Sequence, residues 1–274
     1  MAAISKRSGF SCSTWGVPFA VILAVLLSAC SLPAPTVAIT AATVTTAERV
    51  RDAPEIASPE AELDQRYEAL HLAQPAARLF ALDAGASSLR IHVFRAGRLA
   101  GLGHNHVLTA PRLIGRVLVP EKVNDAQLEL AFRLDELAVD EPAQRASLGP
   151  AWASAMSPEA IAGTRKNMLG EAGLQAEAHP WVRIRSLHIS GELPKLAMEV
   201  EIELHGQKRV QWLALDVQPG PDSLRAQGAL VLHQSEFGVT PFSIGAGLLA
   251  VADELVVEFS LRAVVPGQRP IRNN

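Results

Sequence analysis

The fold is decided by a stretch that reads LELAFRLD, from Leu128 to Asp135, in which apolar residues occupy every second position. Successive side chains of a β-strand point to opposite faces, so this pattern predicts a strand with one apolar face. The same period of two recurs at Leu89–Phe94, Glu199–Leu204 and Leu255–Arg262. We predict further strands at 113–119, 181–190, 209–217 and 224–234.

Short connections rich in turn residues separate these strands, which favours antiparallel neighbours. One segment interrupts the series: Ser157-Pro158-Glu159 begins a predicted helix that ends at Gly170. A single inserted helix is too little for alternating βαβ units. We therefore expect an all-β protein of about eight antiparallel strands, closed as a barrel or packed as a sandwich. An eight-stranded barrel is filled by side chains or holds one small ligand.

The N-terminus has the features of a bacterial export signal. Lys6 and Arg7 precede a continuous apolar run over residues 17–27, which is too short to span a membrane comfortably. Leu27-Ser28-Ala29-Cys30 resembles the lipobox of bacterial lipoproteins. This resemblance implies a signal peptide over residues 1–29, a lipidated Cys30 as membrane anchor and, from Ser31, a place in the outer membrane facing the periplasm. The alternative is an ordinary secretory signal with an incidental cysteine.

The rest of the chain divides by composition. We predict a flexible tether at 30–57, a short helix and lead-in at 58–77, a β-domain at 78–265 and a tail at 266–274. Both cysteines, Cys12 and Cys30, lie in the leader, so the β-domain can form no disulfide. The net charge of −3 without a basic run argues against a nucleic-acid partner. Composition does not indicate the oligomeric state.

Two histidines, His104 and His106, stand two residues apart and would share a face if they lie on one strand. They could hold a metal with a carboxylate such as Asp140 or Asp253, and His92 could approach across the hairpin. Alternatively they hydrogen-bond the backbone or a carboxylate, or they donate to a lipid head group. Arg165 and Lys166 lie late in the predicted helix, and they would meet such a head group if this helix caps the barrel. Alternatively, they form a solvated basic turn, which suits the C-terminus of a helix.

The sequence lacks the common catalytic and nucleotide-binding motifs. There is no Gly-x-Ser-x-Gly elbow, no His-Glu-x-x-His pair and no Gly-x-Gly-x-x-Gly run. No spacing of serine, histidine and acid selects a catalytic triad. We therefore expect a protein without enzyme activity, catalytic residues or cofactor.

Several motifs of the β-domain occur in the order and at the spacing of a known family. They are Phe80-Ala81-Leu82-Asp83, Leu102-Gly103-His104-Asn105-His106, Leu137-Ala138-Val139-Asp140, His179-Pro180-Trp181-Val182, Leu204-His205-Gly206 and Gln234-Ser235-Glu236-Phe237-Gly238. Together they resemble the YceI-like family of periplasmic polyisoprenoid-binding proteins over residues 78–265. The resemblance implies an antiparallel, lipocalin-like barrel whose interior holds an isoprenoid or another amphipathic lipid, and it implies no enzyme activity.

The predicted lipid-binding residues are apolar positions on the inward face of the strands. They are Leu89, Ile91, Val93, Leu130, Phe132, Val182, Ile184, Val257 and Phe259, with His104, His106 and Arg165 as head-group residues. The partner would be a lipid with a long apolar chain. Two alternatives stay open from the residues alone. One is an envelope protein that binds metal or haem through His104 and His106, and the other is a structural module whose core is filled by side chains.

Overall fold

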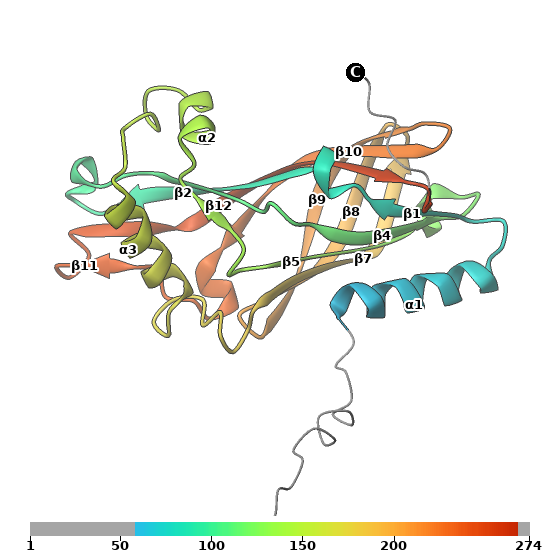
Figure 1. Ribbon diagram of the computed structural model, residues 1–274, viewed down its shortest axis with the longest axis horizontal. Coiled ribbons are helices and arrows are strands. Elements are labelled where there is room, and N and C mark those ends of the chain that lie inside the picture. The colour runs from blue at the N-terminus through green and yellow to red at the C-terminus, as the bar shows by residue number, and fades with distance from the viewer. Residues whose placement is uncertain (1–57, 268–274) are drawn as a thin grey trace, which may run out of the picture. The chain divides into compact units, whose positions relative to one another are not determined.

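The computed structural model describes residues 58–267, in which eight antiparallel strands close a barrel (Figure 1). Around the ring they follow the order β1, β4, β5, β7, β8, β9, β10 and β12, and β12 pairs with β1 to close it. Their bounds are Arg78–Leu82, Ile114–Val119, Gln127–Arg133, Trp181–Glu192, Lys195–Leu204, Gln207–Pro219, Ser223–His233 and Leu249–Val264. The expectation of a closed, all-β, lipocalin-like barrel is confirmed.

The last long strand, β12, bridges two parts of the sheet. One end pairs with β1 at Ala81↔Val264, and most of its length pairs with β2 (Ser88–Ala96). From β2 the sheet continues through β3 (His106–Thr109) to β6 (Ala138–Val139), and the short β11 (Ser243–Ile244) adds to β12. β1 and β2 thus act as two halves of one bent strand, and both line the barrel.

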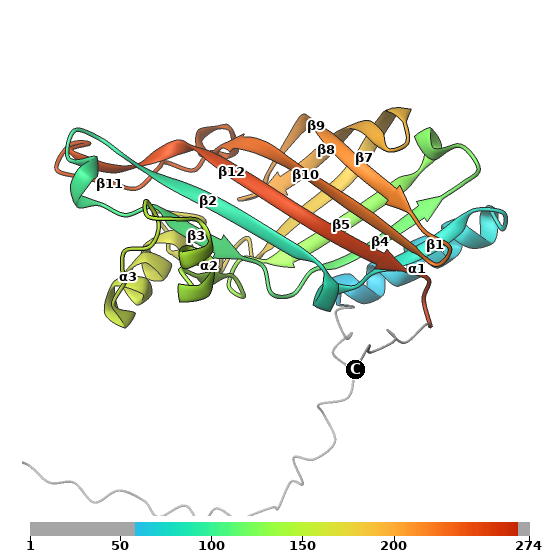
Figure 2. The same cartoon turned by 90° about the horizontal axis from the view of Figure 1, so that it is seen from above.

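The predicted strands and helices are present, with one correction. The helix expected from Ser157 is α3 (Pro158–Leu169), and Ser157 caps it by accepting from the amide of Ala160. A second helix, α2 (Pro142–Ser147), was not predicted, so two helices rather than one are inserted between β6 and β7. A six-residue helix is too short to show an apolar period. Both helices lie at one end of the barrel (Figure 2).

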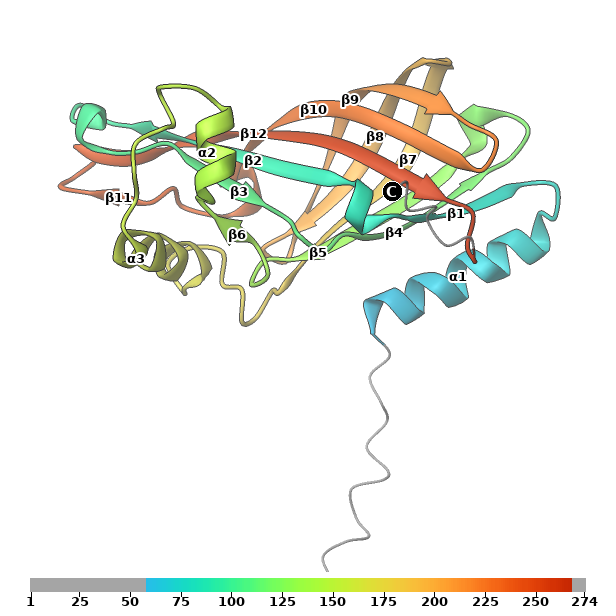
Figure 3. The same ribbon diagram turned by 45° about the horizontal axis from the view of Figure 1, so that its top comes forward.

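The helix α1 (Pro59–Ala73) covers part of the outer face of the barrel near β1 and β4 (Figure 3). Leu63 and Tyr67 are buried against Ile114 and Leu118, so the helix packs on the barrel through its apolar side chains. Burial, with the charge of Glu129, raises the pKa of Tyr67. No helix among residues 58–267 is both long and apolar enough to cross a membrane.

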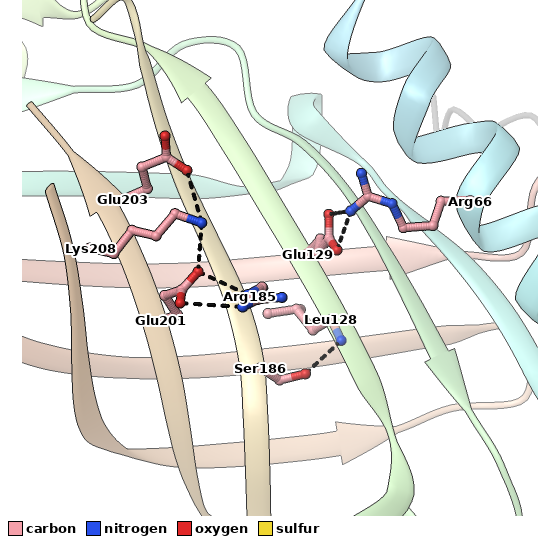
Figure 4. A network of polar contacts seen from close by, with 8 residues as sticks. All are labelled: Arg66, Leu128, Glu129, Arg185, Ser186, Glu201, Glu203 and Lys208. Atoms are coloured by element: carbon pink, nitrogen blue, oxygen red, sulfur yellow. Dashed lines mark hydrogen bonds and ion pairs between the residues drawn. The ribbon is translucent and has the colours of Figure 1, made fainter. Parts of the chain in front are cut away.

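The outer faces of β5, β7, β8 and β9 carry a network of charged side chains, drawn in Figure 4. Arg185 binds Glu201 at 3.0 Å, and Lys208 lies 3.1 Å from the same carboxylate. Arg66 of α1 binds Glu129 of β5, which ties the helix to the barrel wall. The barrel therefore has a charged outer face here, and its apolar side chains point inward.

The export signal, Cys30, the tether and most of the predicted tail lie outside the residues that the structure describes. What the sequence indicates for residues 1–57 and 268–274 therefore stays a prediction.

Candidate functional site

The barrel interior contains two adjoining apolar cavities. Their volumes are about 240 and about 290 Å3. Five residues from five different strands line both cavities, and they are Leu89, Ile184, Ile202, Leu230 and Val257. These residues form a shared ring where the two cavities adjoin, so the cavities lie end to end along the barrel.

The first space, here the hairpin-end cavity, lies at the end of the barrel where turns connect the strands. Pro120 and Val123 of the β4–β5 connection line it, with Leu193 of the β7–β8 turn and Pro219 at the end of β9. Glu121 is the one polar residue in its lining. This cavity therefore offers an apolar chain a wall almost without hydrogen-bonding groups.

The second space, here the helix-end cavity, is bounded by α3 and the segment after it. Its lining combines apolar strand residues with polar side chains. The polar residues are His106, Thr164, Asn167, Gln234 and Thr240. A molecule that fills both cavities would thus have its apolar part in the hairpin-end cavity and its polar groups near α3.

All nine residues predicted to bind lipid line these cavities. Leu130 and Phe259 face the hairpin-end cavity, and Leu89, Ile184 and Val257 belong to the shared ring. The other four line the helix-end cavity, and they are Ile91, Val93, Phe132 and Val182. Their inward position follows from the alternation of apolar and polar residues along each strand. Their contact with a ligand stays a prediction.

His106 joins the lining of the helix-end cavity to a buried ion pair. Its Nδ1 lies 2.6 Å from Oδ2 of Asp140, whose other oxygen accepts from Nη1 of Arg145 at 2.6 Å. Asp140 and Arg145 are 1% and 3% exposed. An ionised carboxylate can only accept, so Nδ1 of His106 carries the proton and donates it. Nε2 is then the ring nitrogen left for a group inside the cavity.

The backbone around Asp140 explains how its carboxylate reaches β3. Asp140 has φ +55°, in the left-handed region that aspartate tolerates better than most residues. This turn sends the chain from β6 into α2 and lets Oδ1 accept from the amide of Val107 at 3.1 Å. Burial by itself raises the pKa of Asp140, but the hydrogen bonds from His106, Val107 and Arg145 outweigh it and hold that pKa below its ordinary value.

The second histidine of the pair, His104, lies outside the strand that contains His106. It precedes β3, is exposed, and its Nδ1 lies 3.1 Å from Oγ of Ser154. The expectation of a common face was conditional on both residues lying in one strand, and β3 begins at His106, so this condition is not met. Ser154 also accepts from Nη2 of Arg145 at 3.0 Å, so His104 belongs to the same polar network from the outside.

The remaining candidates of a metal site are engaged elsewhere. His92 is buried, lies 3.0 Å from Glu258 and packs edge-on against Trp152 at a ring separation of 5.4 Å. Asp253 accepts from the amide of Ser235 at 2.7 Å. Within residues 58–267, no three His, Cys, Asp or Glu side chains gather as a possible metal site.

Arg165 is not directed into the cavity. Its guanidinium donates to the backbone carbonyls of Asp135 and Leu137, in the connection between β5 and β6. It therefore fastens α3 to the barrel rim, and the predicted head-group role would require these bonds to be exchanged. Thr164 and Asn167 of the same helix line the cavity instead.

Solved structures of similar backbone fold include two bacterial proteins. BcnA of Burkholderia cenocepacia is 15% identical, and the match covers 67% of this chain and 99% of that one with a TM-score of 0.49. The YceI protein of Campylobacter jejuni is 8% identical, over 57% of this chain and 83% of that one, with a TM-score of 0.42. No protein-family model and no curated protein matches the sequence. The barrel assignment rests on the strand pairing of this chain itself.

Arg145 is the functional candidate that the sequence pattern does not reveal. It lies on the short α2, between stretches without regular period, and looks like any surface arginine in the sequence. The sequence does contain one indication of its role, because Asp140, five residues earlier, is a candidate partner of the histidines. A buried carboxylate requires a compensating charge, which an arginine five residues later can supply.

Proposed function

We propose that this barrel binds one amphipathic molecule with a long apolar chain, such as an isoprenoid lipid, and that it does so without catalysis. The observation that carries the proposal is the pair of adjoining cavities that share five lining residues, with a nearly apolar lining at one end and polar groups at the other. Binding sites for small molecules commonly occupy roughly 300–1,000 Å3, a range that the two adjoining cavities reach together.

The lining suggests how the molecule lies. An apolar chain in the hairpin-end cavity leaves water and meets leucine, valine and isoleucine side chains, a gain of about 25 cal/mol per Å2 of apolar surface. Its polar group then lies near His106, Thr164 and Asn167. Nε2 of His106 can bond such a group, while Asp140 holds the ring in place.

The place of action belongs to the same proposal and rests on the leader sequence. A lipidated Cys30 would attach the chain to the bacterial outer membrane, with the barrel in the periplasm. The barrel would there hold or carry a lipid taken from the cell envelope.

The test uses two tryptophan variants of neighbouring residues on β10. Leu230 belongs to the shared ring, and Val231 next to it points outward and is 50% exposed. We expect Leu230→Trp to block the passage between the cavities and reduce co-purified lipid by at least about tenfold, whereas Val231→Trp retains it. The full chain is exported in a bacterial host, purified and extracted with organic solvent, and the extract is quantified by mass spectrometry.

Equal lipid in both variants would refute the continuous site, provided both melt cooperatively. A wild-type protein without any extractable organic molecule, from several bacterial hosts, would instead favour a structural module.

A further inference from the structure

Five large apolar side chains lie exposed together at the end of the molecule that carries α3. They are Leu99, Leu102, Phe242, Ile244 and Leu248, and we refer to them as the apolar tip. Leu102 is the most exposed of the five at 75%. Single exposed apolar residues are ordinary on protein surfaces, but a gathered set of this size indicates a contact surface.

The tip is a built element formed by two segments far apart in sequence. The amide of Leu99 donates to the carbonyl of Leu248 at 2.8 Å, and Ile244 pairs with Leu249 in the β11–β12 hairpin. Gly97, at φ +88°, lies so close to Leu248 that a Cβ on it would meet that carbonyl at 2.6 Å. Figures 1 and 3 show β11 beside the turn that follows β2. The five side chains are thus presented by a braced pair of turns.

The two segments that form the tip carry acidic or basic side chains of one sign only. Residues 95–105 and 239–252 contain Arg95 and Arg98 and no aspartate or glutamate. Arg98 is exposed, whereas Arg95 donates to the carbonyl of Gly103 at 2.9 Å. The first acidic residue after the second segment is Asp253, and its carboxylate accepts a hydrogen bond from the amide of Ser235. Apolar side chains flanked by cations are the combination that binds the interface of a membrane with anionic lipids.

The tip is also continuous with the helix-end cavity. Phe242 belongs to both, and Val239, Thr240 and Val251 beside it line the cavity. A lipid surface that received the tip would therefore touch the wall of the cavity. A second copy of the chain would not explain why the exposed apolar residues gather at the cavity rather than elsewhere on the barrel.

We propose that the apolar tip inserts into the interface of an anionic membrane and brings the helix-end cavity to the lipid surface for loading or release. This inference rests on the proposed lipid binding. Leu99, Leu102 and Ile244 enter the acyl boundary, and Arg98 lies among the lipid phosphates. The remaining barrel surface stays in water.

The experiment places an environment-sensitive fluorophore at two exposed leucines in the full chain, with Cys12 and Cys30 replaced by Ser. Leu102→Cys carries the label at the tip, and Leu193→Cys carries it in the β7–β8 turn, which lines the hairpin-end cavity. Vesicles contain either phosphatidylethanolamine with phosphatidylglycerol or phosphatidylcholine alone. We expect a blue-shifted emission and quenching by spin-labelled lipid at residue 102 with the anionic vesicles, and neither change at residue 193.

Two variants sharpen the reading. Ile244→Asp should reduce partitioning of the tip by at least roughly tenfold, because a fully buried apolar side chain contributes about 1.5–3 kcal/mol. Arg98→Glu should remove the preference for anionic vesicles. Val210→Asp, an exposed apolar residue of β9 outside the tip, is the matched control and should bind as the parent protein does.

Each other outcome overturns the proposal. If neither label responds to vesicles, the tip does not insert. If both respond alike, the whole barrel adsorbs without orientation. If residue 102 becomes protected without vesicles as protein concentration rises, the partner is a second copy of the chain. Lipid that co-purifies with the protein is measured separately, so lipid binding can stand even where membrane insertion fails.

Discussion

The two ends of the barrel interior are built from the same strands but offer a ligand different surroundings. The hairpin-end cavity has Glu121 as its one polar lining residue, whereas five polar side chains line the helix-end cavity. The difference comes from what borders each end. Short turns border the first cavity, while α3 supplies Thr164 and Asn167 to the lining of the second. The ring of strands thus provides the apolar space, and α3 makes one end of that space more polar than the other.

The largest expected effect comes from breaking the ion pair behind the helix-end cavity. Arg145→Met leaves the buried carboxylate of Asp140 without its cation, which should lower the free energy of unfolding by about 3–5 kcal/mol. Arg185→Met on the charged outer face should cost about 0–1 kcal/mol, because that pair lies in water. Urea unfolding of both variants measures the difference. Similar losses would show that the pair at Asp140 contributes no more than a surface pair.

A smaller effect is expected from filling the hairpin-end cavity. Ala226→Trp introduces an indole into that space, with an overpacking cost of about 1–3 kcal/mol. The bound molecules should shift toward shorter apolar chains, while their polar groups stay the same. Ala229→Trp, outward on the same strand, is the control. Mass spectrometry of the extracted lipids measures their chain lengths. An unchanged chain-length distribution would contradict the proposed orientation.

The smallest expected effect is the loss of folding stability at acidic pH. The pKa of Asp140 is lowered in the folded protein, so its carboxylate stabilises the fold at pH above the ordinary aspartate pKa of about 3.9. This stabilisation should disappear as the pH falls through the lowered pKa. Unfolding free energies at pH 5 and pH 3 measure it. Asp140→Asn should show a shallower loss between these pH values than the wild type, and parallel curves would assign the acid sensitivity to other carboxylates.

The strands could be predicted because one face of each lies against the interior, and such a face requires an apolar residue at every second position. The lining residues Leu130, Phe132 and Ile184 follow from this rule alone. The rule fails where the backbone leaves the strand. His104 and His106 fit a shared face in the sequence, yet the strand begins at His106.

The volume of the interior and the role of Arg145 could not be predicted. Alternation is identical for a filled core and for a hollow one, since both place apolar side chains inside. The position of α2 depends on contacts between Arg145 and Asp140, which a local pattern does not contain. The structure explains one residue in each of two sequence motifs. Asp140, at the end of Leu137-Ala138-Val139-Asp140, turns the chain, and Gly238, at φ +73°, ends the short helix after β10.

The position of β12 as the last strand has a consequence for the order of folding. β12 pairs with β10, β1, β2 and β11, so it joins the two edges of an otherwise open sheet. Ala81 meets Val264 across nearly the whole domain, and contacts between residues so distant in sequence form slowly. A chain that is still being synthesised cannot close the ring before its final strand emerges. The enclosed interior can therefore form only after β12 is available, when the first and last strands of the barrel meet.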